Sequence, residues 1–226
     1  MQSENAVNPI PPVVIVLCLI AVGVELTFTA AEAGLLGGAR GIGWRIAAIE
    51  DYAFSPAALD YILLRGDFGF DLLKRFLTYP FVHPNFTGAL FGAALLLALG
   101  KFVGDVFGTW PTLAVFVVTA IGGALVFGLA VDGGVPLVGL FPPIYGLIGA
   151  YTYLIWLRLG QTGQNQLAAF RLIGFLLGLQ LAFGLLFGSS PVWIAELAAF
   201  VIGFAISTVL APGGWSALLQ RIRQRS

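Results

Sequence analysis

Long apolar segments constrain this chain more than any other feature of its sequence. They lie at residues 13–31, 84–105, 110–131, 142–158, 167–187 and 192–211. A helix that crosses a hydrocarbon core of ~30 Å needs about 20 residues, which is close to the length of these segments. Of the 226 residues, 59% are hydrophobic and only 10% are charged, unlike an average soluble domain. The sequence predicts an all-α integral membrane protein with six transmembrane helices.

The connections between these segments predict one membrane domain over residues 1–226. Most connections are short and rich in Gly, Ser, Asp or Pro, as in turns. The first loop, residues 32–83, is the exception, because it mixes charged and apolar side chains over a long stretch. That mixture predicts short amphipathic helices at the membrane surface. A basic tail follows at residues 212–226.

Basic residues predict the orientation of the chain. Outside the first loop they fall on one side of a six-span topology, at Lys101, Arg158, Arg171, Arg221, Arg223 and Arg225. The positive-inside rule then places both termini in the cytoplasm, although the basic residues of the first loop oppose it. Residues 1–12 contain no Lys or Arg, so the first segment reads as a retained helix and not as a secretory signal.

Charge and cysteine content exclude several classes of function. The net charge is zero, which suggests no nucleic-acid partner. Cys18 is the only cysteine and His83 the only histidine, so neither a disulfide nor the usual zinc ligand set is expected. The sequence predicts no metal and no cofactor.

The fourth apolar segment is unusual because prolines interrupt it. Pro142 and Pro143 fit the first turn of a helix, where backbone N–H groups have no intrahelical partner. A helix from Pro142 to Arg158 has about 17 residues and is roughly 25 Å long, a short span. Residues 133–141 would reach it as non-helical backbone, which a membrane tolerates only inside protein or beside a water-filled cavity.

Four segments carry a family resemblance. Residues 139–150 read GLFPPIYGLIGA, and residues 75–83, 99–105 and 195–203 read RFLTYPFVH, LGKFVGD and AELAAFVIG. In this order they resemble motifs of the rhomboid family of intramembrane serine proteases. The first resembles the pattern G-x-S-G-x-x-[FY]-G-x-x-G-A, with Phe141 at the position of the serine. The resemblance covers the second to sixth spans and implies a six-helix bundle with a short, central fourth helix.

The departures from the family pattern fall on catalytic positions. The resemblance implies a serine nucleophile on the fourth span, a histidine base on the sixth, and a histidine and an asparagine on the second that hold the oxyanion. The corresponding residues here are Phe141, Glu196, Gly88 and Gly92. No serine occurs from Asp132 to Leu159. Since each missing group would carry a large part of the rate, the sequence predicts a pseudoprotease.

Three functions remain open at this stage. The favoured one is a non-proteolytic binder or regulator of other membrane proteins in a bacterial-type inner membrane. It would take their transmembrane helices at the lateral face between the second and fifth spans, as the fold implies. The alternatives are an active intramembrane serine endopeptidase with a rearranged site, and a small transporter or channel. The sequence does not indicate an oligomeric state.

The emptied site has its own predicted structure. In the family, the aromatic residue one turn beyond the serine packs against the catalytic histidine. We therefore expect a protonated Glu196 to hydrogen-bond the hydroxyl group of Tyr145, with Phe141 filling a dry, closed pocket beside them. Glu25, in the first span, either pairs with an arginine such as Arg45 or reaches the interface.

The remaining predictions concern structural residues. Arg75, Thr78 and His83 are expected to anchor the first loop, with an unspecialised interfacial histidine as the alternative for His83. Small residues on the fourth and sixth spans predict close helix packing. They are Gly146, Gly149, Ala199 and Gly203.

Overall fold

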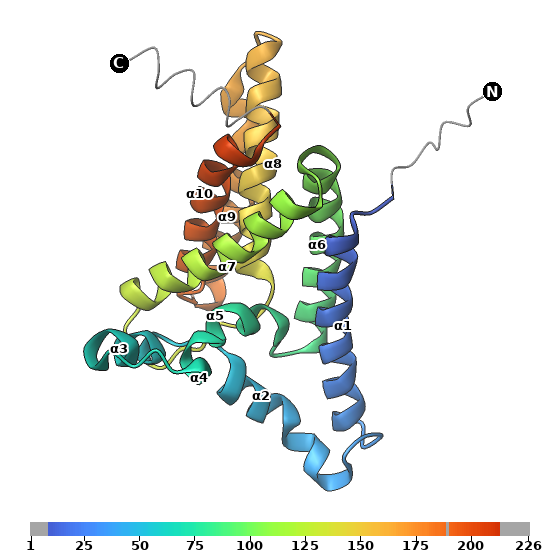
Figure 1. Ribbon diagram of the computed structural model, residues 1–226, viewed down its shortest axis with the longest axis vertical. Helices are drawn as coiled ribbons and strands as arrows, with labels where there is room; N and C mark the ends of the chain where they lie inside the picture. Colours follow the sequence, from blue (N-terminus) through green and yellow to red (C-terminus); the bar gives the residue numbers. More distant parts are fainter. Residues whose placement is uncertain (1–8, 189, 213–226) are drawn as a thin grey trace, which may run out of the picture.

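The computed structural model describes residues 9–188 and 190–212, and it is helical throughout this part of the chain apart from short connections (Figure 1). The predicted basic tail lies outside the described residues, except for Pro212. The long helices are α1 (Pro12–Glu32), α6 (Phe86–Phe107), α7 (Thr109–Ala130), α8 (Phe141–Gln161), α9 (Arg171–Phe187) and α10 (Trp193–Leu210). A short 3-10 helix, η3 (Gln166–Phe170), precedes α9.

Five helical segments of the described chain are long and apolar enough to cross a membrane. They are Pro12–Glu32, Phe86–Phe107, Thr109–Ala130, Gln166–Leu186 and Trp193–Leu210. The fourth predicted span, α8, is not among them, although it lies centrally against α6, α7 and α10. Every residue of α8 from Pro142 to Ala150 is buried, so its N-terminal half packs against protein.

The expected short fourth helix was wrong in its length. Helix α8 has 21 residues and continues past Arg158 to Gln161. Two carbonyl groups near its C-terminal end accept hydrogen bonds from side chains. Gln166 Nε2 donates to Trp156 O at 3.0 Å, and Thr162 Oγ1 donates to Arg158 O at 3.1 Å. Arg158 O also accepts from Thr162 N at 3.1 Å, so the side-chain donors add hydrogen bonds to carbonyl groups near the end of a continuous helix.

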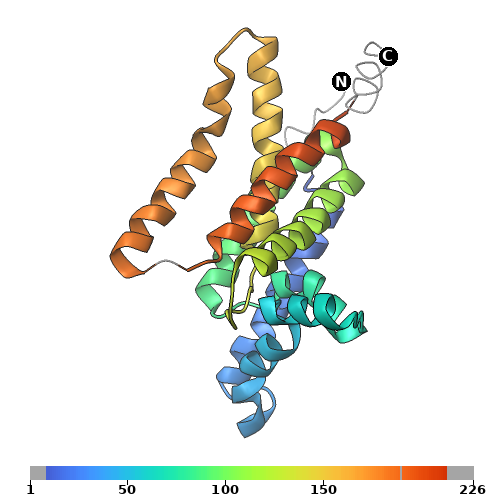
Figure 2. The ribbon, with the colours of Figure 1, turned by 90° about the vertical axis from the view of Figure 1, so that its left-hand side faces the viewer.

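Helices α7, α8 and α10 pack closely together, whereas α1 packs mainly against α6. Helix α9 diverges from α10, to which it is joined through residues 188–192 (Figure 2). Large apolar side chains along α9 are exposed, including Phe175, Leu181 and Leu185. Within the described residues, most side chains of α9 are therefore exposed, unlike those of α8.

The first loop folds into short helices, as predicted. They are η1 (Gly38–Gly43), α2 (Trp44–Tyr52), α3 (Pro56–Arg65), α4 (Phe70–Leu73), α5 (Arg75–Thr78) and η2 (Tyr79–Phe81). Ser55 caps α3 by accepting a hydrogen bond from Ala58 N at 3.3 Å, and Pro56 takes the first helical position. Helices α3 and α5 pack against α7, so the loop is attached to the helical bundle.

A buried ion pair joins this loop to α1. Arg45, in α2, donates to both carboxylate oxygens of Glu25 at 2.8 and 2.9 Å. It also donates to Glu32 at 2.6 Å and to His83 O at 3.0 Å. Of the two alternatives for Glu25, the structure thus selects the pair with Arg45. Arginine suits this position because its planar fork can serve several acceptors at once.

Candidate functional site

The start of α8 is held by residues of the first loop. The backbone groups of Phe54 and Leu137 pair in both directions, with N–O distances of 3.2 and 2.7 Å. Farther along, Gly139 N donates to Tyr79 O at 2.9 Å. These bonds satisfy extended backbone that runs among buried side chains such as Leu137, where an unpaired polar group would be costly. The helix start therefore has a fixed position relative to the loop.

Two of the three residues expected to anchor the first loop donate hydrogen bonds to its backbone carbonyl groups. Arg75 Nη1 donates to Glu50 O and Ala53 O, both at 2.8 Å, and Thr78 Oγ1 donates to Tyr52 O at 2.9 Å. These bonds join α5 to the end of α2. His83 instead contacts the start of α8 through its buried ring.

His83 contacts the residue that precedes α8. Its Nε2 accepts a hydrogen bond from Leu140 N at 3.3 Å, which requires an unprotonated Nε2. The backbone O of His83 accepts from Arg45. One histidine thus connects the start of α8 to the Arg45–Glu25 pair. Burial lowers the pKa of His83.

The lowered pKa of His83 predicts that acid destabilises the fold. Between the folded pKa and the unfolded value near 6.5, the unfolded chain binds the proton more strongly. The free energy of unfolding should therefore fall as the pH drops below about 6.5, by up to ~1.4 kcal/mol per pH unit. Unfolding titrations in mixed micelles between pH 8 and pH 5.5 measure this slope.

His83→Gln is the control for this pH dependence, because the chain has no other histidine. The variant should be less stable at pH 8 and should lose most of the slope between pH 6.5 and pH 5.5. Equal slopes in the two proteins would contradict a buried, neutral His83.

Gly92 shows why His83 and Leu140 fit so closely. A Cβ atom built on Gly92 would lie 3.2 Å from Leu140 Cβ and 3.7 Å from His83 Nε2. Those two side chains thus occupy the space that a larger residue would need there. Gly88 lies one turn earlier on α6, where its N–H donates to the capping Asn85 Oδ1 at 2.8 Å. Neither glycine offers a side-chain donor.

Phe141 occupies the first position of α8. Its ring is half-buried and packs against the main hydrophobic core, while Pro142 and Pro143 behind it are buried. The two prolines lie in the first turn, as expected of residues without a backbone N–H. Phe141 does not line the cavity between α9 and α10 that is described below.

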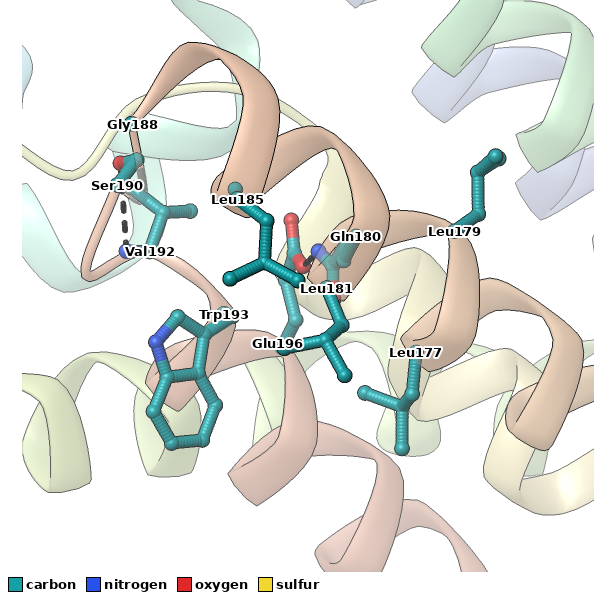
Figure 3. A pocket seen from close by; sticks show the side chains of 11 residues that line it. Leu177, Leu179, Gln180, Leu181, Leu185, Gly188, Ser190, Val192, Trp193 and Glu196 are labelled. Carbon is teal, nitrogen blue, oxygen red and sulfur yellow. Dashed lines mark hydrogen bonds between the residues drawn. The ribbon is translucent and has the colours of Figure 1, made fainter.

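Glu196 lies in the first turn of α10 and is 5% exposed. Its Oε2 accepts a hydrogen bond from Nε2 of Gln180, a residue near the middle of α9 (Figure 3). The expected bond to Tyr145 was wrong: within the described chain the carboxyl group of Glu196 bonds Gln180 alone. A carboxyl group at this position can turn toward α8 or toward α9, and only α9 supplies a side-chain amide.

A cavity of about 680 Å³ opens between α9 and α10 beside this pair (Figure 3). Its walls are mostly apolar, and Leu181, Leu185 and Trp193 contribute to them. Phe141 is not among the residues that line this cavity, so the closed pocket expected at Phe141 stays a prediction. Ser190 also lines the cavity, but its Oγ accepts from Val192 N at 3.4 Å in the turn before α10.

The glycine positions of α8 and α10 bring the two backbones together. A Cβ atom on Gly203 would lie 2.7 Å from Gly146 C and closer still to Gly146 O. One on Gly149 would lie 2.7 Å from Phe204 N. Ala199 is fully buried on the same helix. This close approach fixes the position of Glu196 relative to the start of α8.

Among the residues that the structure describes, the lining of the site offers hydrogen-bond acceptors but no activated nucleophile. Glu196 and Gln180 are the polar groups at the base of the cavity, and Ser190 belongs to the turn. No group of three His, Cys, Asp or Glu side chains that could hold a metal ion occurs among the residues that the structure describes. Gln180 was not predicted as a site residue. The available signal was an isolated amide within a long apolar run.

Comparison with models of known protein families gives a match over most of the chain. Residues 72–213 match the family model described as Rhomboid domain, from α4 through α10. The matched region contains the held helix start, the glycine contacts and the Glu196–Gln180 pair. A search of the curated proteins found no match.

Proposed function

The chain belongs to the rhomboid family, and on this premise we propose that it binds transmembrane helices of other membrane proteins without cleaving them. The observation that carries the proposal is the composition of the site. Phe141 stands at the start of α8 where the family pattern has its serine, and Glu196 stands opposite on α10. A phenyl ring cannot attack a carbonyl group, and Glu196 has no hydroxyl or thiol among its hydrogen-bond partners.

The oxyanion positions support the same proposal. The space beside Gly92 is taken by Leu140 and His83, and the N–H of Gly88 caps its own helix. Because oxyanion donors contribute a large part of the rate in acyl transfer, their absence makes residual catalysis implausible. The site does contain a hydrogen-bonded start of α8 and a close contact between α8 and α10. Both features fix the positions of the helices, and neither supplies a catalytic group.

Helix α9 is the element on which we place partner binding. Its apolar side chains are largely exposed, and the cavity lies between it and α10. Exposure of this kind on a membrane helix accommodates either lipid or another helix. The cavity supports a binding site on the α10 side of α9, whereas the family resemblance implies the face toward α6.

The proposal includes a topology. Helix α8 would cross the membrane in addition to the five segments named above, which gives six membrane-crossing helices. Both termini would be cytoplasmic, and the membrane would be a bacterial-type inner membrane. The central position of α8 between α6, α7 and α10 supports its inclusion. Exposed apolar residues on the first-loop helices, such as Leu64 and Phe70, support their contact with the bilayer surface.

A cleavage assay tests the absence of proteolysis. Purified protein in liposomes is expected to leave a single-span substrate intact, at the same background rate as the Glu196→Ala variant. The released fragment is quantified on gels over several hours. Robust cleavage by the wild type, lost in Glu196→Ala, would establish the alternative of an active protease with a rearranged site.

A crosslinking experiment tests binding at α9. A photo-reactive residue at Leu185, which is 80% exposed on the cavity side of α9, should capture a helical partner in native membranes. The same residue at Leu19, 64% exposed on α1, is the matched control. Equal adduct patterns from both positions would contradict a binding site along α9.

A further inference from the structure

The cavity between α9 and α10 contains acceptor atoms that no described residue uses. Gln180 Oε1 is buried and has no hydrogen-bond partner in the part of the chain that the structure describes. Glu196 uses only its Oε2, in the bond from Gln180. A buried polar atom without a partner is unfavourable, so a donor that bonds to this oxygen would be stabilised there.

Neither α9 beyond Arg171 nor α10 carries a basic side chain that could pair with Glu196. Between Arg171, at the start of α9, and the end of α10 at Leu210, the sequence contains no lysine or arginine. Arg171 itself is nine residues from Gln180, roughly 13 Å along the helix. Acidic residues inside membranes normally pair with a cation or a donor.

The walls of the cavity restrict what can deliver such a donor. They consist mainly of leucine and tryptophan side chains, and the volume of about 680 Å³ accommodates a side chain with part of its helix. Gln180 is seven residues from the end of α9 at Phe187, about 10 Å along the axis. Gln180 therefore lies below the end of α9, at a depth that a helix-borne side chain reaches more readily than a lipid head group.

From this geometry we propose that Glu196 and Gln180 together recognise a lysine or arginine side chain carried by the transmembrane helix of a partner. The inference rests on the proposed function and names the chemistry of the partner. The basic group would donate to Glu196 Oε1 and Gln180 Oε1, the two oxygens with no described partner. The leucines of α9 would cover the apolar part of the partner helix.

Binding of synthetic helices in vesicles tests the inference. A leucine-rich transmembrane peptide with one central lysine is compared with the same peptide carrying leucine there, by energy transfer to labelled protein in phosphatidylcholine vesicles. The lysine peptide should bind the wild type about tenfold more tightly. Glu196→Gln should abolish this preference and leave binding of the leucine peptide unchanged.

Controls separate this inference from the function on which it rests. Glu50→Gln removes one negative charge from an exposed position of α2 and should retain the preference. Equal binding of the two peptides by the wild type, or a preference that persists in Glu196→Gln, would overturn the inference alone. Failure of both peptides to bind would overturn the proposed function as well. A preference that disappears when phosphatidylethanolamine is added would overturn it in favour of a lipid amine.

Discussion

Arg45→Ala should reduce the free energy of unfolding by about 3–5 kcal/mol, the range expected when one partner of a buried ion pair is removed. Arg45 is 7% exposed and Glu25 3% exposed, and the two share a pair of hydrogen bonds. Without the guanidinium group, the carboxylate of Glu25 would remain inside the protein without a cation. The bond from Arg45 to His83 O would also be lost, which loosens the residue that holds Leu140.

Denaturation in mixed micelles measures this effect. Arg40→Ala, in which a nearby exposed arginine is removed, should change stability by no more than about 0.5 kcal/mol. A double variant, Arg45→Met with Glu25→Leu, should recover much of the loss, because an apolar pair leaves no buried charge. A loss of less than about 1 kcal/mol in Arg45→Ala would indicate that water reaches this pair.

The same ion pair illustrates the limit of prediction from sequence. The presence of Glu25 inside an apolar segment indicated a partner, but an isolated charge does not identify which of several loop arginines approaches it. That choice depends on how η1 turns the chain back after α1, and glycines at positive φ angles set the turn at Gly34 and Gly37. Pairs this distant in sequence follow from the tertiary fold and not from local pattern.

Prediction from the sequence was more accurate for features that depend on nearby residues, such as the position of a helix or its first residue. Apolar length identified the helices, prolines located the start of α8 to within one residue, and the motif resemblance identified the family that the match over residues 72–213 confirms. It was weaker at Glu196, where Tyr145 was chosen by analogy with the family. Side-chain direction there depends on where α9 lies, and α9 carries Gln180, an amide that the family pattern gave no reason to consider.

The largest effect expected in the bundle itself comes from Gly203→Ala. Alanine normally stabilises a helix relative to glycine by about 0.8–1 kcal/mol. Here the added Cβ would lie 2.8 Å from Gly146 Cα and 2.7 Å from Gly146 C. Because both are backbone atoms, no side-chain rotation relieves the overlap, and α8 and α10 must move apart. We expect a net loss of stability near the upper end of the roughly 1–3 kcal/mol that overpacking costs.

Gly178→Ala is the matched control, because a Cβ atom built on Gly178 of α9 meets nothing within 4 Å. It should be neutral or slightly stabilising in the same unfolding titration. Separation of α8 from α10 would also displace Glu196 from Gln180, so Gly203→Ala should weaken the preference for the lysine-bearing peptide, whereas Gly178→Ala should retain it. If both variants behaved alike, the close approach of α8 and α10 would not determine the geometry of the site.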